Sequence, residues 1–271
     1  MIADDFGLDE AVNEAVEEGH RHGVLTAASL MVAEGAAADA VRRARRLPGL
    51  GVGLHLSLTH GQSVLPPRDI PHLVDAAGRF DERLVRAALN WCRPRVLEEL
   101  GREVEAQFRA FLATGLPLDH VSVHQHMHLH PALLGALLAS GARCGLPYVR
   151  VPLEPRPMAL GERGQGAVTT LLARRMARRL DARGIRHADR LAGLAVSGRL
   201  GERNLLAILS VLPDGLTEIY GHPAARPTTL LRREQAGYRG EAELAALLSP
   251  RVRQAIAEQG CTLQRCGVAR T

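Results

Sequence analysis

The chain has 271 residues, of which 46% are apolar, enough to form a substantial core in one large α/β domain or two small ones. The sequence contains no run of 18 apolar residues, and its first residues lack the basic and apolar segments of a secretory signal, so we expect neither a membrane-spanning helix nor export. The formal net charge is +5, and every basic residue is arginine. Aromatic residues make up only 3%, which leaves little surface for stacking on bases and argues against nucleic-acid binding.

Short apolar runs alternate with longer amphipathic segments along the chain. Strands are predicted at Thr26–Val32, Val52–Leu58, His120–His126, Tyr148–Leu153 and Thr217–Gly221, with a weaker candidate at Leu191–Val196. Helices are predicted at Asp9–His22, Ala36–Arg45, Arg95–Thr114, Ala132–Arg143, Val168–Arg183, Glu202–Val211 and Glu241–Gln259, the last broken at Pro250. Strands separated by helix-length segments indicate βα units and a parallel sheet. We therefore expect an α/β fold, an irregular (β/α) TIM-like barrel in which residues 1–271 form a single domain and the site lies at the carboxyl ends of the strands.

Two adjacent carboxylates, Asp4 and Asp5, end a first strand in the run ADDFG. Neighbouring side chains on a strand point to opposite faces, but a bend at Phe6–Gly7 could turn both carboxylates into one pocket, because glycine permits a sharp turn. One carboxylate could then bind a cation while the other acts as a general base. The alternative is that one of them only caps the following helix.

Histidines lie in three of the later predicted strands or at their ends. His55 lies in GLHLSLTHG, where a lone strand histidine is more often a core residue than a ligand. The run DHVSVHQHMHLHP holds five of the twelve histidines, and an extended segment would place on one face His120, Ser122, His124, His126, His128 and His130. One or two of these could bind a metal, and the alternative is a solvated polar edge. His222 of YGHPA follows a late strand, where it could take part in the site. The alternative interpretation is that it is a loop histidine without a role.

One carboxylate and two strand-end histidines would form a metal site with open positions for water and substrate. We expect one divalent ion, and the sequence does not choose among zinc, magnesium, manganese, cobalt and iron. Such an ion lowers the pKa of a bound water to about 7, which makes a nucleophile at neutral pH.

The ordered motifs ADDFGL with VNEAV, VGLHLSLT-x-G, D-x-x-x-x-H-x-H-x-H-x-x-P and GHPA resemble the YdjC-like family, which comprises carbohydrate deacetylases on an irregular (β/α) barrel. The resemblance runs from about residue 1 to the last helix. The opening of the chain, together with LPPRDIPHLVDAAGRF, is most similar to the hopanoid-biosynthesis-associated branch of the family. That resemblance implies metal-dependent removal of an acetyl group from an N-acetylglucosamine-type sugar on a hopanoid lipid.

The resemblance also implies roles for individual residues. It implies that the metal ligands are Asp5, His55 and His124, that Asp4 is the catalytic base and that His222 is the general acid. Arg150, His126 and His128 match positions that touch the base, the ligands or the substrate. The family usually has four or five apolar residues before ADD, where this chain has only Met1 and Ile2. We therefore expect either a native start upstream of Met1 or an abnormally short first strand.

Partners and location follow from the same reasoning. The four cysteines, at positions 92, 144, 261 and 266, form no C-x-x-C pair, as is typical of a reducing cytoplasm. The segment Leu171–Arg190 carries seven arginines and two aspartates on a helical pattern, which predicts an apolar stripe packed on the barrel and permits contact with an anionic membrane. The expected partner is an N-acetylated sugar or glycolipid, with a location in the cytoplasm or at the inner face of the membrane, and a homodimer is left open.

Two rival functions remain. A metal-dependent phosphoesterase would use a similar set of histidines and aspartates but would favour two or three metal ions and more ligands. A sugar- or lipid-binding relative without catalysis would not need both Asp4 and His222.

Overall fold

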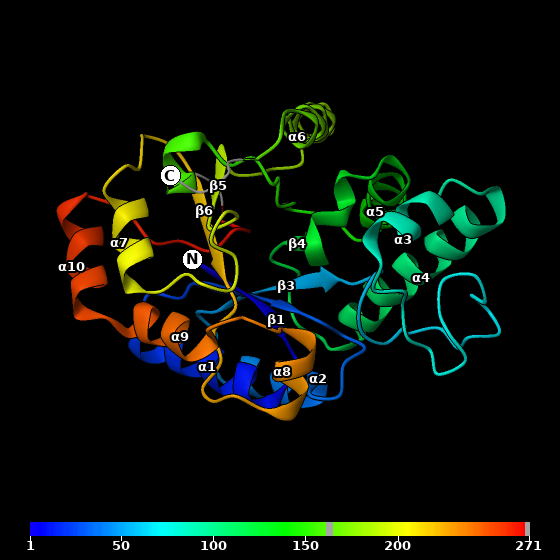
Figure 1. The fold of residues 1–271 in the computed structure, drawn as a ribbon, viewed down its shortest axis with the longest axis horizontal. Helices are drawn as coiled ribbons and strands as arrows, with labels where there is room; N and C mark the ends of the chain where they lie inside the picture. The colour runs from blue at the N-terminus through cyan, green and yellow to red at the C-terminus, as the bar shows by residue number, and fades with distance from the viewer. Residues whose placement is uncertain (161–164, 269–271) are drawn as a thin grey trace.

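The computed structural model describes residues 1–160 and 165–268, and its centre is one parallel β-sheet (Figure 1). The sheet has the strand order β4-β3-β2-β1-β6-β5. Its strands are β1 Ile2–Phe6, β2 Ala27–Leu30, β3 Gly51–Leu56, β4 Val121–Val123, β5 Arg190–Ala192 and β6 Thr217–Gly221. All five neighbouring pairs are parallel, which confirms the α/β class. The segments predicted at 26–32, 120–126 and 217–221 each contain a strand, and those predicted at 52–58 and 191–196 overlap β3 and β5.

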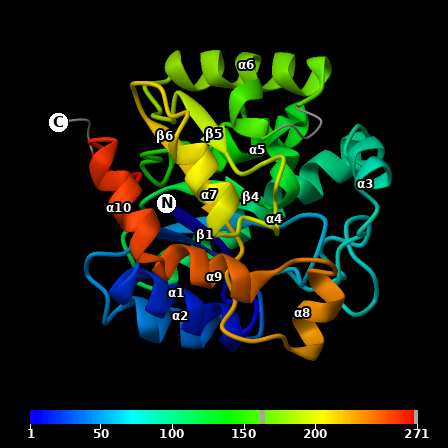
Figure 2. The same cartoon turned by 60° about the vertical axis from the view of Figure 1, so that its left-hand side comes forward.

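Helices connect the strands and cover the sheet (Figures 1 and 2). They are α1 Glu10–His22, α2 Ala37–Ala44, α3 Leu84–Asn90, α4 Pro94–Ala113, α5 Pro131–Ala142, α6 Ala167–Asp181, α7 Glu202–Leu209, α8 Thr229–Glu234, α9 Gly240–Leu248 and α10 Pro250–Glu258, with the 3₁₀ segments η1 His124–Leu129 and η2 Arg156–Ala159. All seven predicted helical segments are confirmed, including the break at Pro250. Ser249 precedes this proline and caps α10 by accepting from the backbone N–H groups of Arg251 and Val252. The short helices α3 and α8 were not predicted.

The sheet forms a half-barrel, and the closed TIM-like barrel expected from the sequence is compatible with it but not confirmed. The gap between β4 and β5 is spanned by the segment that begins at Tyr148, which was predicted as a strand. That segment makes only isolated parallel bridges, from Val149 to Val121 on one side and from Tyr148 to Arg186 on the other. Its irregularity follows from the prolines at 152, 155 and 157, which cannot donate ladder hydrogen bonds.

The first strand has five residues and includes both aspartates, so the expectation of an abnormally short strand is wrong. The bend also lies one residue earlier than predicted. Asp5 has φ = 61°, and the pairing of β1 with β2 shifts register between Ala3 and Phe6. This irregularity, rather than a turn at Phe6–Gly7 alone, redirects the Asp5 side chain. Neither aspartate caps α1, since the cap is Asp9, which accepts from the N–H of Ala11.

The histidine-rich run is not one extended segment. Strand β4 ends at Val123, and η1 begins at His124. Gln125 and His126 both have positive φ, at 54° and 56°, so the alternation of faces stops there. The prediction that six residues of this run share one face is therefore wrong beyond His124.

The apolar stripe predicted on the arginine-rich helix is partly confirmed. In α6, Ala173, Met176 and Leu180 are buried, whereas Leu171 remains 62% exposed. No helix within the described ranges has the length and apolar character needed to span a bilayer.

Candidate metal centre

Three side chains from different strands converge at the carboxyl ends of the sheet. Asp5 is contributed by β1, His55 by β3, and His124 follows directly after β4. The Oδ1 atom of Asp5 lies 3.3 Å from Nε2 of His55 and 3.3 Å from Nδ1 of His124. The two imidazole nitrogens are also 3.3 Å apart. The three potential ligand atoms thus form an equilateral triangle.

This triangle fits a bound metal ion. Ligand atoms at about 2.0–2.1 Å from a tetrahedral ion stand roughly 3.3–3.4 Å from one another. The Asp5 Oδ1 atom is buried and forms no hydrogen bond, although buried oxygens are normally satisfied. The other ring nitrogen of His55, Nδ1, is 2.7 Å from the hydroxyl of Ser122, which turns Nε2 toward the triangle. Asp5, His55 and His124 are therefore the residues that could hold a divalent cation.

The second oxygen of Asp5 has a partner that the sequence reasoning missed. Gln235, just after α8, donates from Nε2 to Oδ2 of Asp5 at 2.7 Å. Both side chains are buried. This bond leaves Oδ1 as the oxygen available to a metal. Gln235 lies 230 residues from Asp5, after a short helix without a strong periodic pattern, so no sequence signal joined the two.

Asp4 belongs to a buried charge network with Arg150. The guanidinium donates to both oxygens of Asp4, at 2.5 and 2.9 Å, and through Nε to Glu218. Tyr148 donates its hydroxyl to the other oxygen of Glu218 at 2.6 Å. Burial alone would raise the pKa of Asp4, but the adjacent Arg150 charge holds that pKa well below its usual range. Asp4 is thus ionised at neutral pH, and the predicted contact of Arg150 with it is present.

His222 lies close enough to Asp4 and Asp5 to favour their ionised forms electrostatically. It follows β6 and is buried, and its backbone N–H donates to Glu243 at 2.5 Å. Its ring packs near Tyr220 and Tyr238, with centroids 5.6 and 4.8 Å away. The Nδ1 atom is buried and has no hydrogen-bond partner, so it is available to a bound molecule.

The later histidines of the run support this network from outside the triangle. His128 lies 2.8 Å through Nε2 from the backbone carbonyl of Arg150, and burial lowers the pKa of His128 to about 4 although this bond opposes the shift. It is therefore neutral and donates this bond. His126 lies 3.2 Å from the hydroxyl of Tyr220. Neither ring belongs to the triangle of potential ligand atoms.

His60 is a further residue that was not singled out from the sequence. It follows β3 by a few residues, and its ring centroid is 5.3 Å from that of His124. Its Nδ1 atom is buried without a partner. Burial is the main cause that lowers the pKa of His60, so it presents a neutral imidazole beside the triangle.

A second group with metal-ligating side chains has a structural explanation. Asp119, His120 and Cys266 lie together, but at the amino end of β4, opposite the triangle. Both oxygens of Asp119 accept backbone N–H groups of the C-terminal tail, from Cys266 and Gly267, and Oδ2 also pairs with Nδ1 of His120. The other ring nitrogen of His120 pairs with Ser29. Asp119 and His120 thus hold each other, and Asp119 anchors the C-terminal tail through the backbone of residues 266 and 267.

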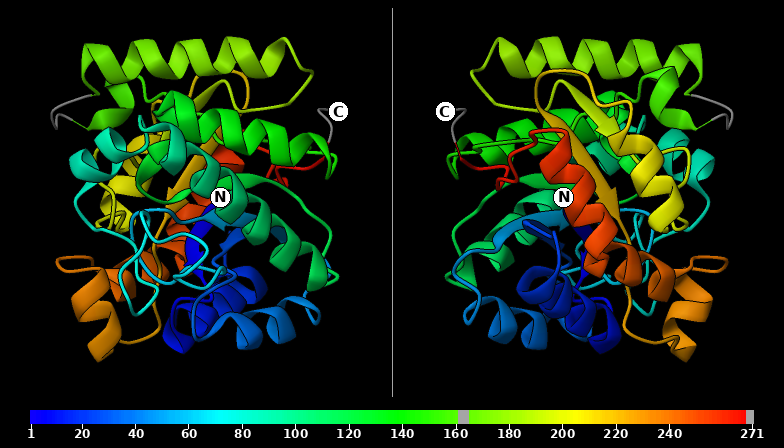
Figure 3. Two further views of the ribbon diagram at one scale, coloured as in Figure 1. Left: turned by 90° about the vertical axis from the view of Figure 1, so that its right-hand side faces the viewer. Right: turned by 90° about the vertical axis from the view of Figure 1, so that its left-hand side faces the viewer.

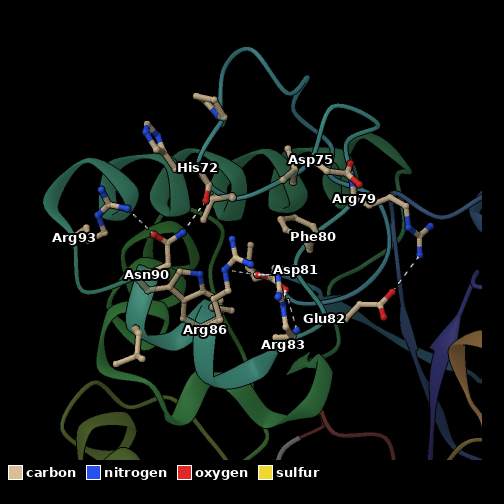
Figure 4. A pocket seen from close by; sticks show the side chains of 17 residues that line it. His72, Asp75, Arg79, Phe80, Asp81, Glu82, Arg83, Arg86, Asn90 and Arg93 are labelled. Atoms are coloured by element: carbon tan, nitrogen blue, oxygen red, sulfur yellow. Dashed lines mark hydrogen bonds and ion pairs between the residues drawn. The ribbon is translucent and has the colours of Figure 1, made fainter.

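A hollow of about 1010 Å³ lies beside the site rather than in it (Figure 4). It lies between α3 and the loop that precedes it, and Leu58, Phe80 and Trp91 contribute apolar parts of its wall. None of the residues of the triangle, nor Asp4 or His222, lines it. Its chemistry is therefore separate from that of the convergent polar groups.

Comparison with known proteins gives a consistent set of relatives. The model of the family described as YdjC-like protein matches residues 1–258. A carbohydrate deacetylase of Brevibacillus brevis is 42% identical over 153 residues, which are 55% of this chain and only 57% of that relative. A chitooligosaccharide deacetylase of Serratia marcescens is 30% identical over 275 residues, covering 96% of this chain and 94% of the relative. A carbohydrate deacetylase of Vibrio campbellii is 31% identical and covers 96% and 92%.

A solved structure supports the same fold over nearly the whole chain. It is a protein of Enterococcus faecalis V583 to which cleavage of cellobiose phosphate is provisionally ascribed. The two structures superpose with a TM-score of 0.78 at 26% sequence identity, covering 98% of this chain and 95% of the other.

Proposed function

The chain belongs to the YdjC-like family, and on that premise we propose that it is a metal-dependent deacetylase that hydrolyses the N-acetyl group of an amino sugar. Relatives that cover almost the whole chain are named for deacetylation of carbohydrates and chitooligosaccharides. The observation that carries the proposal is the triangle of Asp5, His55 and His124 beside a buried carboxylate and an unpartnered imidazole nitrogen. Two histidines and one carboxylate are the donor set of many hydrolytic zinc sites and also suit iron, manganese or cobalt.

Each of these side chains has a part in the proposed hydrolysis. When bound, the cation supplies Lewis acidity toward the acetamide carbonyl and toward water. Asp4 takes a proton as the water oxygen adds to the carbonyl carbon. His222 then gives a proton to the nitrogen as the carbon–nitrogen bond breaks, releasing acetate and the free amine. Arg150 holds Asp4 ionised and in place for this step.

Acetate release from N-acetylglucosamine oligomers, measured with and without a chelator, tests the proposal. We expect release that depends on added divalent metal and disappears in His124→Ala. Undiminished release after complete removal of metal would overturn metal dependence, and no release from any N-acetylated sugar would overturn the deacetylase assignment.

For the natural substrate we propose an N-acetylglucosaminyl group carried by a hopanoid lipid. The support is the similarity of the chain opening and of residues 65–80 to the hopanoid-associated branch of the family. Equal turnover on soluble chitobiose and none on the glycosylated hopanoid would instead place the chain with relatives that act on soluble sugars.

A further inference from the structure

Exposed apolar side chains concentrate on two helices. Among the described residues, four large apolar side chains are more than half exposed, and α3 and α6 carry all of them. They are Val85 at 75% and Leu89 at 69% on α3, and Val168 at 72% and Leu171 at 62% on α6. Every other large apolar side chain in the described ranges is at most 45% exposed. Single exposed apolar residues are ordinary, whereas a concentration of them marks an interaction surface.

Topology places both groups at the mouth of the site. Helix α3 lies in the connection from β3 to α4, and α6 follows the segment that begins at Tyr148. In parallel βα units these connections leave the carboxyl ends of the strands, which is the end that carries the triangle. In Figure 2 and in the left view of Figure 3, α3 lies below one end of α6 on the same side of the molecule. Val168 and Leu171 are in the first turns of α6.

Positive charge surrounds these apolar residues. The segment 81–95 has four arginines against two acids, and Arg83 and Arg86 share Asp81 (Figure 4). The first turns of α6, residues 167–175, contain two arginines, Arg174 and Arg175, and no acid. Apolar side chains within a cationic fringe are complementary to a bilayer with anionic headgroups. A symmetric contact with a second copy would bring these like charges together.

We propose that the surface formed by α3 and the first turns of α6, hereafter the rim, docks on an anionic lipid bilayer with the mouth of the site facing the headgroups. The benefit of docking rests on the proposed function: a sugar attached to a membrane lipid reaches the triangle without leaving the bilayer. Docking itself does not depend on catalysis. This surface differs from the arginine face of the whole helix considered from the sequence, because it includes α3 and only the beginning of α6.

Sedimentation with vesicles tests the rim. The wild-type chain should bind vesicles of phosphatidylglycerol and phosphatidylcholine, bind pure phosphatidylcholine much more weakly, and lose binding as salt is raised. A variant with Val85, Leu89, Val168 and Leu171 all changed to Gln should bind at least tenfold more weakly. The matched control changes Val211 and Leu263 to Gln; these residues are 42% and 41% exposed and lie outside the rim.

The fluorescence of the single tryptophan provides a second test, which reports on the rim itself. Trp91 is buried directly after α3, and bromine atoms on lipid chains quench tryptophan only at short range. Brominated anionic vesicles should quench Trp91 in the wild type and in the control variant, and not in the rim variant. Deacetylation of a soluble oligosaccharide should be unchanged in the rim variant, while deacetylation of an N-acetylglucosaminyl lipid in vesicles should fall at least tenfold.

Absence of sedimentation at low salt, or equal binding by the rim and control variants, would overturn docking. A wild-type dimer that becomes monomeric in the rim variant, with no vesicle binding, would reassign the surface to contact between copies. Vesicle binding without deacetylation of any N-acetylated sugar would retain docking and overturn only the proposed function.

Discussion

The hydrogen bond from Gln235 to Asp5 should set the affinity of the metal centre. In Gln235→Met the side chain keeps its length but loses the N–H groups, so Oδ2 of the fully buried Asp5 has no partner and the carboxylate can rotate. Hydrogen bonds that orient metal ligands typically contribute 10- to 100-fold to metal affinity, which is about 1.4–2.7 kcal/mol. That range agrees with roughly 1.5–3 kcal/mol for a hydrogen bond to a charged group. We therefore expect the dissociation constant for zinc to rise by about 10- to 100-fold.

Competition with a chromophoric chelator would measure this constant, and thermal unfolding of the metal-free protein would report any general loss of stability. The control is Gln254→Met on α10, whose exposed amide donates to Glu258 one turn further along the same helix. A change below about threefold in Gln235→Met would refute the reasoning and would mean that the backbone at Asp5, with its positive φ, is sufficient to aim the carboxylate.

Three further predictions concern the same centre. His124→Ala should lose stoichiometric metal, measured by elemental analysis, and detectable turnover, measured by acetate release. Full metal content together with a normal rate would contradict the role of His124 as a ligand. Asp4→Asn should retain the metal but lose about 10²- to 10⁴-fold in kcat, and a loss under tenfold would mean that another group is the base. Removal of metal by a chelator should abolish acetate release, and readdition of zinc or cobalt should restore it; failure of every divalent ion to restore activity to a folded protein would count against the centre.

The sequence predicted the parts of the structure that depend on local pattern. Alternation of strand and helix predicted a parallel α/β fold, and strand-end positions predicted that a carboxylate and two histidines would meet, because parallel strands end on one edge of a sheet. The choice of Asp5, His55 and His124 was implied by the family resemblance. Local pattern could not predict where the alternation of faces stops. The sequence predicted a strand from His120 to His126, but positive φ at Gln125 and His126 turns the chain after Val123.

Long-range partners were harder to foresee for a different reason. Gln235 and Glu218 lie in segments whose composition is ordinary, and their importance arises only from the side chains that folding places opposite them. The contact of Arg150 with Asp4 was foreseen through the family resemblance alone, since 146 residues separate the two. Likewise, the exposure of Leu171 depends on how α6 packs on the rest of the fold, which a helical pattern does not specify.

The buried network around Arg150 permits a last prediction that separates geometry from stability. Arg150, Asp4 and Glu218 are all buried, and breaking a buried ion pair costs about 3–5 kcal/mol because the remaining charge has no partner. Arg150→Met should therefore lower the melting temperature by roughly 6–20 °C. The combined variant Arg150→Met, Asp4→Asn, Glu218→Gln leaves no uncompensated charge, and we expect it to recover more than half of that loss while remaining inactive, because a neutral amide at position 4 cannot take a proton. If calorimetry shows the combined variant to be no more stable than Arg150→Met, the loss comes instead from the packing of the guanidinium on the Tyr220 ring, 4.7 Å from its centroid. Recovery of stability would mean that an uncharged core of the same shape holds the fold as well, so the charges of the network serve to aim and ionise Asp4 rather than to stabilise the fold.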